Sequence, residues 1–232
     1  MLRPVYPPSP EETEIAVQPF LLDRTPVTNA QYLAFVRANP RWQRGAVPSL
    51  FVDEGYLALW SGATKLGPRA QPQAPVVHVS WFAAKAYCEA QGARLPTENE
   101  WELAAAASET QPDASRDPAF LARILGWYSR PAPAQLPEVG QGAPNYWGAQ
   151  DLHGLVWEWV VDFGNALVSG DSRESGDPDT MRFCGAGALS AKDKDDYASF
   201  MRLAFRSSLQ PAYTTPSLGF RCARSVAEGD AR

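Results

Sequence analysis

Two carboxylate residues, Asp151 and Glu158, flank a glycine in the stretch DLHGLVWEWVVDF. From Trp157 onward, bulky apolar residues alternate along the chain, which is the period of a β-strand and places Glu158 between two tryptophans. A carboxylate buried there needs a metal ion or a cationic partner. Gly154 allows a sharp turn that faces carbonyl groups inward, and carboxylates with carbonyls form the all-oxygen ligand set that calcium prefers. The spacing alone favours a calcium site and a buried ion pair with an arginine equally.

Composition limits the class of protein. The chain has 232 residues, of which 45% are hydrophobic and 20% charged, so it is long and apolar enough to bury a core. A net charge of −5 and an isoelectric point near 5.1 argue against a nucleic-acid-binding surface. No apolar run has the length of a membrane span, and no signal-peptide core is present. The 21 prolines, 17 glycines and 8 tryptophans favour a loop-rich fold with aromatic packing.

Local signals predict four helices. Three of them begin at a hydroxyl cap, and in two of these a capping box adds a glutamine or glutamate three residues further on. The fourth begins at an Asp-Pro pair and is expected to stop at a glycine. The predicted helices start at Thr28, at Ser80 (ending at Gly92), at Thr97, and at Asp117 (running through Leu125, with Gly126 as the stop).

Short strands are predicted between long loops, at Ile15–Leu22, Val76–Val79, Phe183–Leu189, Phe200–Arg206 and Leu218–Ala223. No internal repeat and no interdomain linker interrupts the chain. We therefore expect an extended arm over residues 1–14, one domain over 15–226 and a tail over 227–232.

Four segments in this order resemble the formylglycine-generating enzyme family, also called sulfatase-modifying factors: FLLDRTPVTNAQYLAFV, VVHVSWFAAKAYCEAQGARLPTENEWELAAAA, GAQDLHGLVWEWVVDF and LGFRCAR. The resemblance covers residues 15–224. It implies an α+β fold related to C-type lectins, rich in loops, with short strands and a few helices. It also implies structural calcium, held by the side chains of Asp151 and Glu158 and the carbonyls of Gly154 and Val156. The resemblance thus favours calcium over the ion pair.

The same resemblance implies a disulfide between Cys88 and Cys222, with Cys184 as a free thiol. Such a bridge closes a loop of over a hundred residues and stabilises the fold by about 4–5 kcal/mol in the chain-entropy model. Disulfides persist in oxidising compartments, so we expect a periplasmic or exported protein whose signal is absent from this sequence. The alternative is a cytoplasmic protein with buried free thiols.

The expected chemistry departs from that of the family. Formylglycine-generating enzymes hold copper(I) with two cysteines five residues apart, and soft thiolates are what that ion requires. Counting back from LGFRC places those positions at Asp193 and Ala198, and neither is a thiol. Formylglycine formation is therefore not expected unless Cys184 supplies it. Cys184 is the candidate catalytic residue, and its alternative role is that of a small buried hydrophobe.

Iron enzymes of the superfamily use three histidines, whereas this chain has two. We expect His78 to be a satisfied core histidine and His153 to pack within or cap its loop. The ligands visible in the sequence support neither a copper nor an iron site.

The segments CGAGALSA, DYASFMRLAFRSSL and ILGWYSRP also resemble exported proteins encoded beside copper nitrite reductases. Other proteins similar to the family act as immunity factors that bind toxins. We therefore predict a calcium-stabilised accessory protein that binds a protein or peptide partner, with immunity-type binding as a special case. A groove of Trp157, Trp159, Asp193 and Arg206 would receive the partner. The alternative is a metal-dependent oxidase of altered chemistry that uses Cys184. The sequence specifies neither the partner nor the oligomeric state.

Overall fold

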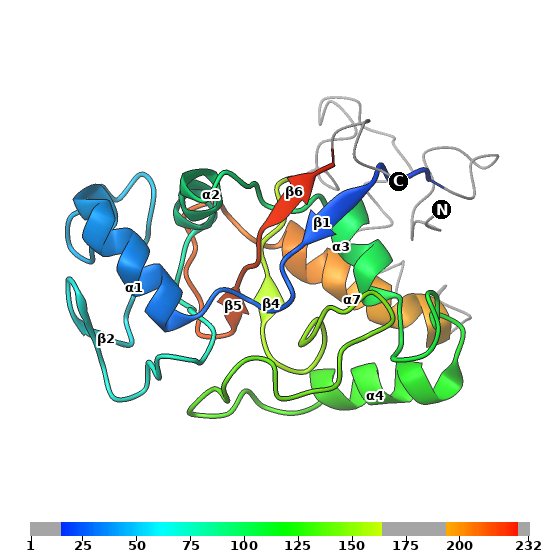
Figure 1. The fold of residues 1–232 in the computed structure, drawn as a ribbon. Helices are drawn as coiled ribbons and strands as arrows, with labels where there is room; N and C mark the ends of the chain where they lie inside the picture. Colours follow the sequence, from blue (N-terminus) through cyan, green and yellow to red (C-terminus); the bar gives the residue numbers. More distant parts are fainter. Residues whose placement is uncertain (1–14, 164–193, 227–232) are drawn as a thin grey trace, which may run out of the picture.

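The computed structural model describes residues 15–163 and 194–226, in which helices and very short strands are joined by long loops (Figure 1). Each sheet in this part of the chain has two strands. The strands β1 (Phe20–Leu22) and β6 (Ala223–Ser225) are antiparallel, as are β2 (Trp60–Gly62) and β3 (Lys65–Leu66), whereas β4 (Trp157–Glu158) and β5 (Leu218–Gly219) are parallel. This is the loop-rich α+β architecture predicted from the sequence.

Three helices begin where their caps predict. The side chains of Thr28, Ser80 and Thr97 each accept a hydrogen bond from a backbone N–H three residues further on, and both capping boxes are complete. A 3₁₀ helix, η1 (Pro40–Trp42), follows the first of these helices. Their bounds are Asn29–Ala38 for α1, Trp81–Ala90 for α2 and Glu98–Ala105 for α3.

The fourth predicted helix is longer than expected. Asp117 caps α4 (Pro118–Tyr128) as predicted, but the helix continues through Gly126 to a C-cap at Ser129. Gly126 is not among the residues with positive φ, so it does not adopt the left-handed conformation of a terminating glycine. The predicted stop at Gly126 is therefore wrong.

The predicted strand Phe200–Arg206 is wrong, because these residues lie in α7 (Lys194–Ser207). Residues 200–206 contain no valine, isoleucine or threonine, and leucine, alanine, methionine and arginine all favour helices. The helix packs on α4 through an apolar cluster that joins Ala198 to Phe120, Leu121 and Ile124.

Other predicted strands are shorter than expected or absent. Of the predicted strand Ile15–Leu22, only β1 forms. The predicted strand Leu218–Ala223 is divided between β5 and the start of β6. Val76–Val79 is not a strand, because His78 has a φ of 57°, which breaks the extended run. The predicted strand Phe183–Leu189 lies outside the described residues.

The main core joins α1 and α2 to the C-terminal strands. It contains Tyr32, Trp60, Tyr87, Trp159 and Phe220, all buried. The predicted disulfide between Cys88 and Cys222 is present in this core and fastens α2 to the segment that precedes β6. In the described residues, no helix is long and apolar enough to cross a membrane.

Candidate functional site

The stretch from Asp151 to Glu158 ends in β4, which lies beside β5. Trp159 donates its backbone N–H to the Gly219 carbonyl at 3.0 Å. A Cβ on Gly219 would lie 2.8 Å from the carbonyl oxygen of Val76, so glycine allows β5 to approach that backbone. The pairing brings the residues that follow β5 up to Glu158.

Glu158 is paired with Arg221, two residues beyond β5. Arg221 Nε donates to Oε2 and Nη2 to Oε1, both at 2.8 Å, and neither side chain is exposed to solvent. The other N–H groups of Arg221 donate to the carbonyls of Asp23, Arg24 and Gln150. All five guanidinium donors are therefore used. The buried ion pair considered from the sequence is present, and its partner is Arg221.

The oxygen atoms expected to hold calcium are only partly occupied by hydrogen bonds. A carboxylate offers about four lone-pair sites. The Glu158 carboxylate accepts three hydrogen bonds. Two come from Arg221 and one from the Trp101 indole N–H at 2.7 Å. Asp151 accepts one bond, from the Gly140 N–H at 2.5 Å. No N–H group of the described residues donates to the carbonyl of Gly154 or Val156. Two carboxylates and two carbonyls therefore still have lone pairs, and oxygen atoms of these kinds are the ligands that calcium prefers.

The backbone of this loop also has an unusual conformation. Asp151 has a φ of 60° and Gly154 a φ of 98°. A left-handed conformation is costly for a residue other than glycine, and such strain is often found at functional sites. Within the described residues, no group of three or more His, Cys, Asp and Glu side chains is gathered for a metal ion. A cation here would therefore depend on the two carbonyls as much as on the carboxylates.

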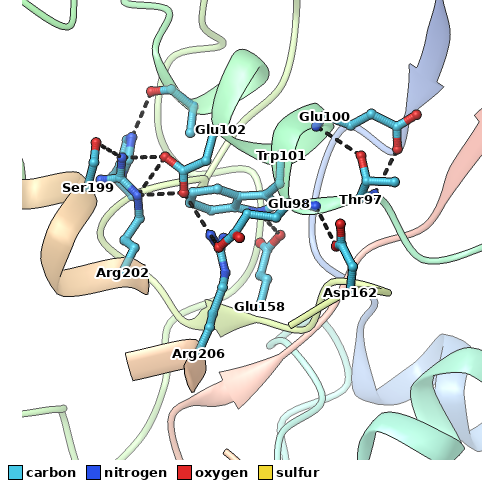
Figure 2. Close-up of polar contacts among 12 residues, drawn as sticks. Thr97, Glu98, Glu100, Trp101, Glu102, Glu158, Asp162, Ser199, Arg202 and Arg206 are labelled. Carbon is cyan, nitrogen blue, oxygen red and sulfur yellow. Dashed lines mark hydrogen bonds and ion pairs between the residues drawn. The ribbon is translucent and has the colours of Figure 1, made fainter. Parts of the chain in front are cut away.

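Two arginines of α7 form ion pairs with two glutamates of α3 near Glu158 (Figure 2). Arg202 donates to both oxygens of Glu102, with Nη2 at 2.5 Å from Oε2. Arg206 Nη1 donates to Glu102 at 2.8 Å and to Glu98 at 2.9 Å. Both arginines are buried. This network joins α3 to α7.

The two glutamates have pKa values shifted in opposite directions. Burial acts to raise the pKa of Glu102, but Arg202 and Arg206 outweigh it and lower the pKa to about 2. Burial raises the pKa of Glu98 above its usual value, and Arg206 offsets this only in part because Glu102 and Asp162 add negative charge nearby. Glu98 is the weaker partner, since it shares one nitrogen of Arg206 with Glu102.

Trp101 connects the ion pair of β4 to the network between α3 and α7. Its indole N–H donates to Glu158, while the guanidinium carbon of Arg206 lies 4.6 Å from the ring centroid and that of Arg202 lies 5.8 Å away. Figure 2 shows the indole of Trp101 beside both Glu158 and Arg206. None of these arginines was predicted from the sequence as the partner of an acidic residue.

Four half-buried aromatic residues, Trp127, Tyr128, Trp157 and Phe205, form what we call the aromatic surface. The ring of Trp157 stacks on Phe205 at 4.6 Å and on Tyr128 at 5.1 Å, and lies 5.3 Å from Trp127. The hydroxyl of Tyr128 accepts a hydrogen bond from Arg202 at 3.0 Å. The polar network therefore fixes one edge of this surface.

Two of the four residues predicted to line a groove, Trp159 and Arg206, are buried. Trp159 is 0% exposed and donates its indole N–H to the Val79 carbonyl at 2.9 Å, and Arg206 is only 4% exposed. Neither side chain can line a groove open to a partner. Trp157 remains partly exposed, and Asp193 lies outside the described residues.

The positions expected for the copper ligands are described only in part. Ala198 is 1% exposed, and it belongs to the apolar cluster between α7 and α4. Asp193 and Cys184 lie outside the described residues, so their roles remain predictions.

The two histidines differ in their environments. The His153 ring packs edge-on against Trp101 and Phe120, and its Nε2 lies 2.8 Å from the Ala105 carbonyl oxygen, which confirms the packing expected for it. Burial lowers the pKa of His153 to about 4, with Arg202 adding to the effect. Nδ1 of each histidine has no hydrogen-bond partner in the described residues, but His78 makes no other side-chain hydrogen bond there and is only half-buried. The expectation that His78 is a satisfied core histidine is therefore wrong.

Comparison with known proteins identifies the family of this chain. Residues 7–226 match the family described as the sulfatase-modifying factor enzyme 1-like domain. A formylglycine-generating enzyme from Streptomyces coelicolor is 32% identical, over 91% of this chain and 80% of that protein. A mouse protein named inactive C-alpha-formylglycine-generating enzyme 2 is 30% identical, over 92% of this chain and 77% of that protein. A hercynine oxygenase from Mycolicibacterium thermoresistibile is 36% identical, over 63% of this chain and 36% of that protein. The chain therefore belongs to the sulfatase-modifying factor family.

Proposed function

We propose that this chain is a binding protein that retains the fold of its family without the copper-dependent oxidase chemistry. The observation that carries the proposal is the burial of Ala198, which stands where the resemblance places one of the two copper-binding thiols. Its methyl group packs between α7 and α4 and has no lone pair to donate to a metal. A relative whose name calls it inactive is similar over most of this chain, which supports the same conclusion.

The aromatic surface is the proposed docking site for an extended segment of a partner protein. Tryptophan and tyrosine are enriched among residues that dominate binding energy, because they bury a large area at a small entropic cost. Trp157 is held on two sides by stacked rings, and Arg202 anchors Tyr128. A surface already fixed in place loses less freedom when a partner binds.

Calcium is the proposed structural cofactor. Asp151 and Glu158 would hold the ion together with the carbonyls of Gly154 and Val156, and the ion would supply positive charge that fixes the loop. Because Trp157 precedes Glu158 directly, fixing this loop also positions the aromatic surface. The Cys88–Cys222 disulfide supports an exported or periplasmic location, because such bridges persist in oxidising compartments.

The first test is chemical. The purified protein is incubated with copper, a reductant and a Cys-x-Pro-x-Arg peptide, with an active formylglycine-generating enzyme in parallel. Mass spectrometry should detect the mass loss of thiol-to-aldehyde conversion only in the parallel reaction. Turnover by this chain that disappears in Cys184→Ser would overturn the proposal and make Cys184 the catalytic residue.

The second test concerns the partner. The chain is used to capture proteins from an extract of the cell that produces it, and the captured protein is then purified and titrated. Trp157→Ala should weaken binding of that protein by at least tenfold, which is typical of an interface residue that dominates affinity. Trp147→Ala is the matched control, because Trp147 is 56% exposed and is not part of the aromatic surface. Equal binding by both variants would exclude the aromatic surface as the docking site.

A further inference from the structure

The part of the chain from Arg24 to Cys88 has a charge opposite to that of the whole protein. It contains seven lysines and arginines but only two acidic residues, a net charge of +5 in a chain whose total is −5. Four of the seven basic residues lie on or beside α1, η1 and the β2–β3 hairpin. Figure 1 shows α1 and β2 on the opposite side of the molecule from α4 and α7. We call these four the basic cluster: Arg37, Arg41, Arg44 and Lys65.

Three residues of the basic cluster lie on the β2–β3 hairpin or contact it. Arg37 donates to the Thr64 carbonyl at 3.4 Å, and Arg44 donates to the Trp60 carbonyl. Lys65 lies on the same hairpin, in β3. All four basic side chains belong to exposed residues, and none forms an ion pair with an acidic side chain in the described part of the chain. Their charges are therefore available to an anionic partner.

Two apolar residues, Leu50 and Phe51, form an exposed turn beside this cluster, which we call the apolar tip. The Phe51 N–H donates to the Pro48 carbonyl at 3.0 Å and closes the turn, and Leu50 is 75% exposed. Such positions are normally occupied by glycine or polar residues. Phe51 contacts Trp42 with ring centroids 6.4 Å apart, and the guanidinium of Arg41 lies 5.9 Å from the Trp42 centroid. Trp42 therefore joins the apolar tip to Arg41 of the basic cluster.

We propose that the apolar tip and the basic cluster attach this protein peripherally to an anionic lipid bilayer. Apolar side chains enter the boundary between headgroups and acyl chains, while arginine and lysine remain at the level of the lipid phosphates. A protein partner fits less well, because leucine is under-represented among the residues that dominate protein interfaces and the most exposed side chain of this turn is Leu50.

The two acidic residues of this part of the chain do not reverse its charge. Asp53 and Glu54 follow the apolar tip directly. The Asp53 carboxylate accepts hydrogen bonds from the backbone N–H groups of Gly55 at 2.9 Å and Thr214 at 3.0 Å, so it is directed back toward the protein. Attachment through this surface is independent of the aromatic surface and of the partner proposed for it.

The test uses the full chain and sedimenting vesicles of phosphatidylcholine, either alone or with a third of phosphatidylglycerol. The protein should bind only the anionic vesicles, and the bound fraction should fall as sodium chloride is added, because salt screens the attraction. Arg41→Ala and Lys65→Ala should each lower the partition coefficient about fivefold. Leu50→Ser should lower it roughly tenfold, because its side chain no longer enters the bilayer.

Leu21→Ser is the matched control for Leu50, since Leu21 is 62% exposed but lies on β1, away from the apolar tip. Arg224→Ala is the control for charge, because Arg224 is partly exposed on β6. Both control variants should bind vesicles like the unaltered protein. The absence of binding to anionic vesicles, or equal losses in Leu21→Ser and Leu50→Ser, would overturn the proposal. Salt-sensitive binding to polyglutamate without binding to vesicles would instead identify a site for acidic proteins.

Discussion

Arg221 donates to both carboxylate oxygens of Glu158 at 2.8 Å, at a position where neither side chain is exposed to solvent. A buried carboxylate without such a partner would be strongly destabilising. Because Arg221 also donates to three backbone carbonyls, it holds the start of the domain, the loop before Asp151 and the C-terminal strands together.

Replacing Arg221 by methionine should destabilise the protein by about 3–5 kcal/mol, because the charge of Glu158 would be left buried without compensation. Denaturation by guanidinium chloride measures this loss. Arg224→Met is the control, since Arg224 is 46% exposed, and its effect should stay within about 0.5 kcal/mol. A comparable effect of both substitutions would show that the buried pair is not an important source of stability.

Removing calcium with a chelator should lower the melting temperature, because an ion that binds only the folded state stabilises it. At a hundredfold excess over its dissociation constant, the ion contributes about 2.7 kcal/mol, or roughly 5–10 °C for a chain of this size. In Asp151→Ala the chelator should have little effect. An unchanged melting temperature of the unaltered protein would mean that Arg221 alone compensates Glu158.

Thiol counting under denaturing, non-reducing conditions should find one reactive thiol, that of Cys184, because Cys88 and Cys222 are joined. Three reactive thiols would contradict both the bridge and the oxidising compartment. In Cys222→Ser the free energy of unfolding should fall by about 4–5 kcal/mol, because the bridge joins residues 134 positions apart and closes a long loop.

Glu98→Gln should stabilise the protein at neutral pH. The pKa of Glu98 is raised in the folded state, so its ionised form costs stability above that pKa, and the cost disappears as the pH falls through it. The advantage of the variant should therefore shrink on acidification.

Glu102→Gln is the matched comparison, since the pKa of Glu102 is lowered to about 2. Ionised Glu102 stabilises the fold above its unfolded pKa, and this contribution is lost as the pH falls toward 2. The variant should lose about 3 kcal/mol or more at neutral pH, because it leaves Arg202 with a poorer partner. Unfolding measured across the acidic range tests both substitutions, and a loss of stability in Glu98→Gln at neutral pH would contradict the assignment.

Elements with local signals were predictable from the sequence. Thr28, Ser80 and Thr97 begin their helices as expected, because a cap and its partner lie within one turn of each other. The strand assigned to Phe200–Arg206 was wrong although its composition favours a helix, since apolar residues in a short segment do not distinguish the two structures.

Pairings over long distances in the chain were not predictable. Glu158 and Arg221 are 63 residues apart, and Glu102 and Arg202 are 100 apart, so no spacing rule links them. One signal was available for Arg221, because it stands between apolar residues in LGFRCA and an arginine buried there requires an anion. The burial of Arg206 depends on how α7 packs on α3, and α7 was itself predicted incorrectly.

Pairing of β1 with β6 means that the domain is entered and left by neighbouring strands, with Phe20 opposite Ser225. Paired strands lie about 4.8 Å apart, so the start of β1 and the end of β6 lie next to each other. Such a unit can be inserted into a loop of another protein without forcing that loop to open widely. It also suits circular permutation, in which the old ends are joined by a short linker and new ones are cut in an exposed turn.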